Sequence, residues 1–234
     1  MVTSNEIPYI ALASCYWQLG DYKKAIKTLQ DYEDEKPDVL DRESLYALYA
    51  HNYYGLGSYK SAYEYQSKYI EEIKSITRGC DLAVEYSNLS EIAKKINDIN
   101  AMEEAIKAAL EICEDNWFVL NNLCELYLYK KDYKKALNEI EKAKLISAGH
   151  PMIYITMGDL KREIGKDNEA LDHYFQAIIN DSTIADPYRK IALIFKSQGN
   201  GDFIEYYQKA AHLGDKDAKI WIMRNNRLIK KTQE

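Results

Sequence analysis

Hydrophobic residues recur along this chain with helical spacing, in six segments that are each followed by a second helical segment. In the first segment Tyr9, Leu12, Ala13 and Tyr16 share one face, at the i, i+3, i+4, i+7 spacing of an amphipathic helix. The matching sets in the later segments are Tyr46, Tyr49, Ala50 and Tyr53; Tyr86, Leu89, Ser90 and Ala93; Leu120, Leu123, Cys124 and Tyr127; Tyr154, Met157 and Gly158; and Tyr188, Ile191, Ala192 and Phe195. The pattern predicts six pairs of helices.

A short polar turn separates the two helices of each pair. The first copy reads Gly20-Asp21-Tyr22-Lys23-Lys24-Ala25. Glycine suits the left-handed residue that ends a first helix, and the aspartate caps the second helix by accepting its free N–H groups. The corresponding turns begin at Gly57, Asn97, Lys131, Gly165 and Gly199. Each turn predicts a hairpin of two antiparallel helices.

The hairpins repeat at a period of 34 residues, because successive copies start at Ala83, Trp117, Pro151 and Ala185. Such units cannot bury a core alone, so they must stack into a solenoid. We therefore expect a single all-α domain over 1–234, with an amphipathic capping helix at its end. The predicted repeats are 6–39, 43–76, 83–116, 117–150, 151–184 and 185–214, and the predicted cap is 215–230. Extra residues at 77–82 are the predicted hinge between the first two repeats and the other four.

The combination of a large-x-x-Leu-small-x-x-Tyr first helix, a Gly-Asp-Tyr-x-x-Ala turn and trailing Ala-Leu runs resembles the tetratricopeptide repeat. Pro37 also stands where that family often has a proline. The resemblance covers roughly nine-tenths of the chain, and the segment 206–218 is also similar to the related Sel-type repeats. It implies a right-handed superhelical α-solenoid whose first helices line a concave groove.

In that fold the groove is where a partner binds, and three groups of residues are expected to line it. Aromatic residues of the first two repeats would anchor an apolar side chain, paired asparagines would hydrogen-bond a peptide backbone, and an acidic stripe flanked by an arginine would favour lysine or arginine in the partner. The predicted groove residues are Trp17, His51 and Tyr54; Asn121 and Asn122; and Glu91, Glu125, Asp159 and Arg162. The alternative is that Trp17 packs on a neighbouring helix and that the stripe is only solvated.

A familiar use of this fold is the clamp that holds the C-terminal carboxylate of a chaperone tail. The clamp needs lysine, asparagine and arginine in set positions of three successive first helices. The first three copies carry Ile10, Ser14, Leu48, Val84 and Asn88 at those positions. We therefore expect no chaperone-tail carboxylate clamp.

Composition narrows the classes of partner. The net charge of −6 and the pI of about 5.4 argue against binding to nucleic acid. A basic stretch with Arg224, Arg227, Lys230 and Lys231 is interpreted as part of the capping helix rather than as a membrane contact. The sequence shows no signal peptide or membrane-spanning run, and the four cysteines, at 15, 80, 113 and 124, form no C-x-x-C pair. We expect reduced, packed thiols and a cytoplasmic protein.

No catalytic or phosphate-binding motif is present, and none of the four histidines has a second ligand at metal-binding spacing. We therefore expect no enzyme activity, cofactor or metal. The leading hypothesis is a monomeric, non-catalytic protein–protein interaction scaffold that binds a peptide or helix of a partner. The alternatives are a peptide-responsive sensor or regulatory segment of a larger multidomain protein, suggested by a chain that starts almost inside its first helix, and self-assembly through exposed repeat faces.

Overall fold

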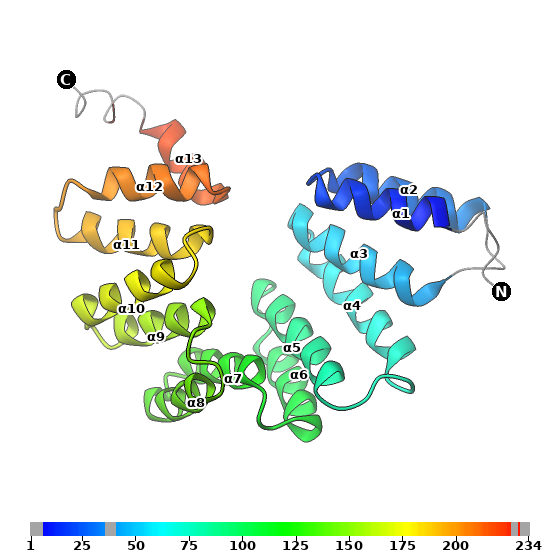
Figure 1. The fold of residues 1–234 in the computed structure, drawn as a ribbon, viewed down its shortest axis with the longest axis horizontal. Coiled ribbons are helices and arrows are strands. Elements are labelled where there is room, and N and C mark those ends of the chain that lie inside the picture. The colour runs from blue at the N-terminus through cyan, green and yellow to red at the C-terminus, as the bar shows by residue number, and fades with distance from the viewer. Residues whose placement is uncertain (1–6, 36–40, 226–228, 230–234) are drawn as a thin grey trace. The chain divides into compact units, whose positions relative to one another are not determined.

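The computed structural model describes residues 7–35, 41–225 and 229, and within them it contains thirteen α-helices and no strand (Figure 1). The first helices of the six hairpins are α1 (Ile7–Gln18), α3 (Arg42–Leu56), α5 (Cys80–Lys95), α7 (Trp117–Tyr129), α9 (Pro151–Glu163) and α11 (Ala185–Ser197). The second helices are α2 (Tyr22–Glu35), α4 (Tyr59–Ile73), α6 (Ile99–Ile112), α8 (Tyr133–Ile146), α10 (Asp167–Asn180) and α12 (Phe203–His212), and α13 (Lys216–Arg224) follows them. The predicted all-α fold of helix hairpins is confirmed.

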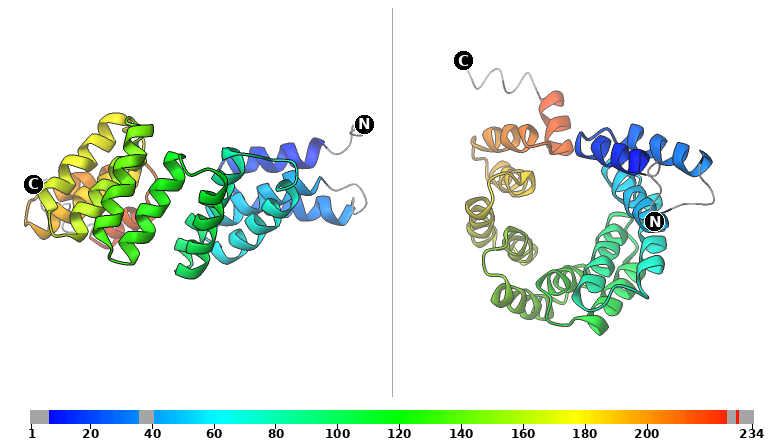
Figure 2. Two further views of the ribbon diagram at one scale, coloured as in Figure 1. Left: turned by 90° about the horizontal axis from the view of Figure 1, so that it is seen from below. Right: turned by 45° about the vertical axis from the view of Figure 1, so that its right-hand side comes forward.

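The chain divides into two compact units, Met1–Asn122 and Leu123–Glu234, each a stack of hairpins (Figure 2). The division falls inside α7, not at the hinge predicted for 77–82. The residues Cys80 to Leu82, expected to be a loop insertion, form the first turn of α5. In unit 1, α5 packs on α4 through a cluster that contains Ile70, Ile73 and Leu82. The helices on the two sides of 77–82 therefore pack together within unit 1, and the hinge predicted there stays a prediction.

The turns have the predicted left-handed residue, but the predicted side-chain cap forms in only some of them, because α4, α10 and α12 begin without a side-chain cap hydrogen bond. Gly57 ends α3 with a left-handed backbone (φ 85°), and the same conformation is held by the non-glycine residues Asn97 (φ 59°) and Lys131 (φ 58°). The side chains of Asp98 and Asp132 accept hydrogen bonds from backbone N–H groups and so cap α6 and α8. Because each turn costs few residues and reverses the chain, consecutive helices form antiparallel pairs.

The core of each unit is built from alanine, branched aliphatic residues and tyrosine. Tyr32 and Tyr49 are buried in the core of unit 1, and Tyr174 is buried in the core of unit 2. Leu12, predicted to be part of the first core face, is instead 45 % exposed. The helical period predicts which residues share a face, but Leu12 lies at the edge of that face on the first helix of the stack.

The capping helix is confirmed as α13, in the part of the cap that the structure describes; Arg227, Lys230, Lys231 and also Pro37 lie outside the described residues. Asp215 caps α13 by accepting a hydrogen bond from the N–H of Ala218 (2.7 Å). The same carboxylate receives a hydrogen bond from the guanidinium of Arg189 on α11 (3.0 Å). Polar and apolar contacts together thus hold α13 on unit 2.

Candidate interaction surface

An exposed aromatic surface lies on the first helices of unit 1. The rings of Trp17 on α1 and His51 on α3 are 5.8 Å apart, Trp17 is 41 % exposed, and His51 is exposed. Tyr54 follows His51 by three residues and therefore lies on the same side of α3, half-buried with its ring against Tyr59 (5.4 Å). We call Trp17, His51 and Tyr54 the aromatic surface.

The helix that carries Trp17 is unusual in having no charged residue at all. Its polar Ser14, which lies between Ile10 and Trp17, turns its hydroxyl back to the carbonyl of Ile10 (2.9 Å). Ala13 on the same helix is completely buried in the unit 1 core. One side of α1 is therefore fixed by packing, and the side with Trp17 offers an apolar, uncharged surface.

The paired asparagines have a different role from the one predicted. Asn121 and Asn122 are both completely buried. The amide nitrogen of Asn122 donates to the carbonyl of Ser87 (3.0 Å) and to the hydroxyl of Ser90 (3.0 Å), both on α5. Asn122 therefore joins α7 to α5 inside unit 1, and its predicted contact with a bound peptide is corrected to an internal one. The burial of Asn121 likewise leaves no surface for such a contact.

Asp159, one member of the predicted acidic stripe, is tied into unit 2. Its carboxylate accepts hydrogen bonds from the ammonium of Lys190 on α11 (2.7 and 2.9 Å) and from the hydroxyl of Tyr174 on α10 (2.7 Å). Burial, followed by the charge of Asp159, raises the pKa of Tyr174 well above its usual range. The charge of Asp159 is therefore balanced internally and does not serve as an open acidic contact.

The other charged residues of the prediction divide between the units. Glu91 in unit 1 and Glu125 in unit 2 are half-buried, and each interacts with a neighbour. Arg162 on α9 is exposed, and its charge acts on Tyr174. A continuous stripe through Glu91, Glu125 and Asp159 stays a prediction, and the carboxylate of Asp159 within it is paired with Lys190.

A hollow of about 550 Å³ on unit 1 had no signal in the helical pattern. It is lined by Tyr46 and by residues of α4, namely Lys60, Tyr63, Glu64, Ser67, Lys68, Glu71 and Glu72. The ammonium of Lys68 is 2.7 Å from Glu64 and 4.7 Å from the centre of the Tyr65 ring. The ammonium of Lys68 is thus already paired with Glu64.

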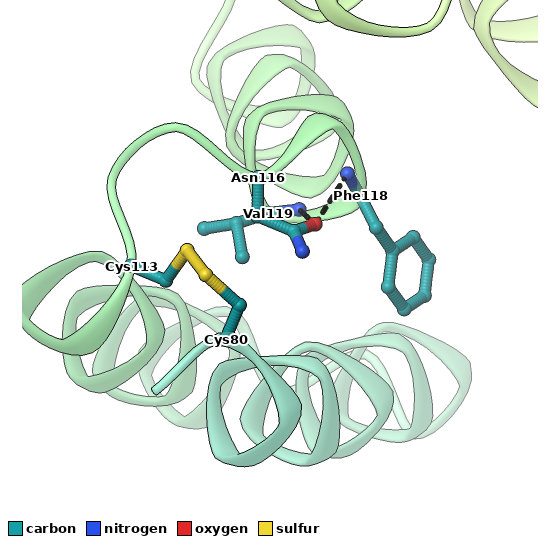
Figure 3. Close-up of a disulfide and its surroundings, with 5 residues drawn as sticks. All are labelled: Cys80, Cys113, Asn116, Phe118 and Val119. Carbon is teal, nitrogen blue, oxygen red and sulfur yellow. Dashed lines mark hydrogen bonds between the residues drawn. A yellow bond between two sulfur atoms is a disulfide. The ribbon is translucent and has the colours of Figure 1, made fainter. Parts of the chain in front are cut away.

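Sequence reasoning also missed a disulfide. Cys80 and Cys113 are bonded, with their Cα atoms 5.1 Å apart (Figure 3). The expectation of four reduced thiols is wrong for this pair, while Cys15 and Cys124 are free, the first exposed and the second buried. Burial raises the pKa of the Cys124 thiol far above its usual range, so that this thiol stays protonated.

In the described part of the chain, no group of three or more His, Cys, Asp or Glu residues could hold a metal ion. None of the helices in the described ranges is both long and apolar enough to cross a bilayer.

Comparison with known proteins identifies the repeat. The tetratricopeptide repeat model matches residues 8–38 and 86–116. No curated protein sequence matches the chain.

Solved structures agree in fold. A tetratricopeptide repeat protein from Parabacteroides merdae is 14 % identical, with a TM-score of 0.77 over 100 % of this chain and 87 % of that chain. A chain of the APC/C hetero-tetramer Cut9–Hcn1 is 15 % identical, with a TM-score of 0.66 over 94 % of this chain but only 42 % of that longer chain. PilW, a type IV pilus biogenesis factor, is 14 % identical, with a TM-score of 0.61 over 94 % of this chain and 100 % of that chain.

These likenesses concern the fold, and the two matched repeats supply the sequence signature. The hairpin turns, the buried alanines at positions such as Ala25 and Ala136, and the capping helix are what the repeat requires. The described helices therefore have the fold of tetratricopeptide repeat proteins, and residues 8–38 and 86–116 carry the sequence signature of that repeat.

Proposed function

We propose that the chain is a non-catalytic scaffold that binds a peptide or helix of a partner protein on the first helices of unit 1, with Trp17 as the main anchor. The observation that carries the proposal is the aromatic surface. There Trp17 stays 41 % exposed beside the exposed His51, and α1, the helix that carries Trp17, has no charged residue. Tryptophan residues that keep exposed area on a rigid element are frequent anchors of protein interfaces.

The partner segment that suits this surface carries a large apolar side chain. Such a side chain would cover the exposed part of Trp17 and pack against His51, with Tyr54 at the next turn of α3. Burial of apolar area supplies about 25 cal/mol per Å², so a single aromatic anchor accounts for a large share of a peptide's affinity. Asp159 and Asn122 take no part in binding in this proposal, because both are used internally.

A peptide-display selection against the intact chain tests the proposal. Peptides selected on the wild type would be titrated against Trp17→Ala and against Tyr129→Ala, a control that truncates another exposed aromatic residue (44 %) on α7. We expect binding at least about tenfold weaker for Trp17→Ala and unchanged for Tyr129→Ala, which corresponds to the loss of one hot-spot residue.

Folding of both variants would be checked by their thermal melts, so that a loss of binding is not a loss of structure. Equal affinity of the wild type and Trp17→Ala for the selected peptides would move the binding site away from the aromatic surface. Failure to select any peptide from a library with aromatic and aliphatic anchors would contradict the scaffold proposal itself.

A further inference from the structure

The third hairpin differs from the others in being closed covalently. α5 and α6 run antiparallel, so the start of α5 and the end of α6 lie together at the end opposite the Asn97 turn. The Cys80–Cys113 disulfide joins these two ends across a sequence separation of 33 residues. Among the described residues it is the one hairpin whose open end is closed by a covalent bond, which Figure 3 shows.

The helical turn that carries Cys80 is itself an addition to the repeat. The period of the later copies places the start of the third repeat at Ala83, yet α5 begins three residues earlier, directly after Gly79. Gly79 has a positive φ of 66° and offers no side-chain cap. The first turn of α5 therefore lacks the cap that starts α6 and α8, and the disulfide supplies its fixed point.

The disulfide also lies next to the buried residues on which α7 packs. Cys113 packs against a buried cluster of Ala83, Ala109 and Val119, which come from α5, α6 and α7. All three are completely buried. Loosening the start of α5 or the end of α6 would therefore disturb the packing of the first turns of α7 within unit 1.

The bond is nevertheless open to solvent. Cys80 is exposed and Cys113 is only half-buried. A thiolate in solution can therefore reach a sulfur of this bond without unfolding the hairpin, and exposed disulfides are the ones that exchange readily. Cys124, by contrast, is sealed in the core.

From this geometry we propose that Cys80–Cys113 is a redox-sensitive clamp on the third hairpin, and that the protein works in an oxidising compartment where the clamp stays closed. Closure removes two protons and two electrons from the two thiols and forms one S–S bond. The electrons pass by thiol–disulfide exchange to a small-molecule or protein disulfide, which leaves as two thiols. Excess dithiol reverses the reaction and frees the first turn of α5. The compartment follows from the bond, since disulfides persist where thiols are not kept reduced.

Thiol counting on the wild-type protein tests the compartment without any variant. Cells of the native host would be quenched in acid, and the unfolded protein would be alkylated before and after reduction. Mass spectrometry of the intact protein would then count the alkyl labels. We expect two labels before reduction, on Cys15 and Cys124, and four after it. Four labels before reduction would overturn the proposal, because the clamp would then be open where the protein works.

Thermal unfolding with and without a dithiol tests the clamp. The loop length predicts that reduction lowers the Tm of the wild type by roughly 10 °C. Cys15→Ser, the control for a general effect of thiols, should show the same shift, and the double variant Cys80→Ser, Cys113→Ser should melt like the reduced wild type with no response to dithiol.

Hydrogen exchange on the wild type locates the effect if the double variant does not fold. Reduction should speed exchange in the first turns of α5 and α7 and leave α1 to α3 unchanged. An unchanged Tm together with unchanged exchange on confirmed reduction would show that the bond fixes nothing, and the clamp would be rejected.

Discussion

The first helices of the two units use equivalent repeat positions for opposite purposes. His51 in unit 1 and Asp159 in unit 2 occupy the same position of their repeats, yet His51 is exposed beside Trp17, whereas Asp159 is bound by Lys190 and Tyr174. The repeat period places both on the same face of a first helix. What separates them is the next first helix along the chain, which supplies a lysine to Asp159. A position in a repeat thus indicates a face, and the neighbouring helix decides whether that face is free.

The strongest test of this difference is to place a lysine at position 159 and, separately, at position 51. Asp159→Lys would set a second ammonium beside Lys190 and leave the buried Tyr174 hydroxyl without its acceptor. We expect it to lower the free energy of unfolding by roughly 2–4 kcal/mol, because a buried hydrogen bond is lost and like charges meet. Urea denaturation followed by circular dichroism measures this change.

The matched substitution His51→Lys should change the free energy of unfolding by less than about 0.5 kcal/mol, as is usual for an exposed position. Asp159→Asn, which keeps an acceptor for Tyr174, should fall between the two. If Asp159→Lys were as stable as His51→Lys, the internal role assigned to Asp159 would be refuted.

Two helix glycines extend the comparison to packing. A methyl group on Gly158 in unit 2 would lie 2.4 Å from the Tyr174 ring, and one on Gly55 in unit 1 would lie 2.5 Å from the Tyr22 ring. Tyr174 is completely buried and cannot move aside, whereas Tyr22 is half-buried and can rotate outward. We expect Gly158→Ala to destabilise the chain by roughly 1–3 kcal/mol through overpacking.

Gly55→Ala should be close to neutral, since alanine recovers up to about 1 kcal/mol of helix propensity that offsets the displacement of Tyr22. The pair would be compared by the same urea titrations. Equal destabilisation by the two substitutions would mean that Tyr22 is as fixed as Tyr174, and that exposure does not distinguish the two rings.

The fold could be predicted from the sequence to within a few residues, and the reason is local. Turns such as the one after Gly57 and starts such as Pro151 depend on residues that are neighbours in the chain, and both are where the period placed them. Even Asn97 and Lys131, which tolerate a left-handed backbone less well than glycine, hold the turn that their place in the repeat demands.

The candidate site was harder to predict from the sequence, because the contacts of its residues depend on side chains that are distant along the chain. Asn122 was expected to bind a partner, but Ser87 and Ser90, more than 30 residues earlier, take up its amide. Asp159 meets Lys190 from the following repeat. The exposed pairing of Trp17 with His51 could be anticipated, since both were assigned to the same groove face.

The disulfide was missed because the residues 77–82 break the period and so favoured a loop. Once Cys80 lies in a helical turn, the antiparallel hairpin brings it to Cys113, which is nearly one full repeat away. A cysteine at each open end of one hairpin is thus a signal that can be read from the sequence, but only when the insertion is recognised as helical.

The smallest predicted effect concerns a salt bridge between α9 and α10 in unit 2. Glu169 on α10 receives hydrogen bonds from Lys161 on α9 (2.7 Å) and Lys166 (2.6 Å), which lower the pKa of Glu169 to about 2. At the equivalent positions of the first hairpin in unit 1, the ammonium of Lys24 instead lies 5.6 Å from the centre of the Tyr16 ring. Because the folded pKa of Glu169 lies below its ordinary value of 4.5, the charged form stabilises the fold.

That stabilisation is fully present above about pH 4.5 and is lost as the pH falls toward about 2. The wild type should therefore be slightly more stable than Glu169→Gln at pH 6, and the difference should shrink as the pH is lowered through this window. Salt should also reduce it, because the pair is exposed and screened. Urea titrations of the two proteins at several pH values measure the difference, and a gap as large at pH 2.5 as at pH 6 would show that Glu169 acts through packing of its side chain and not through its charge.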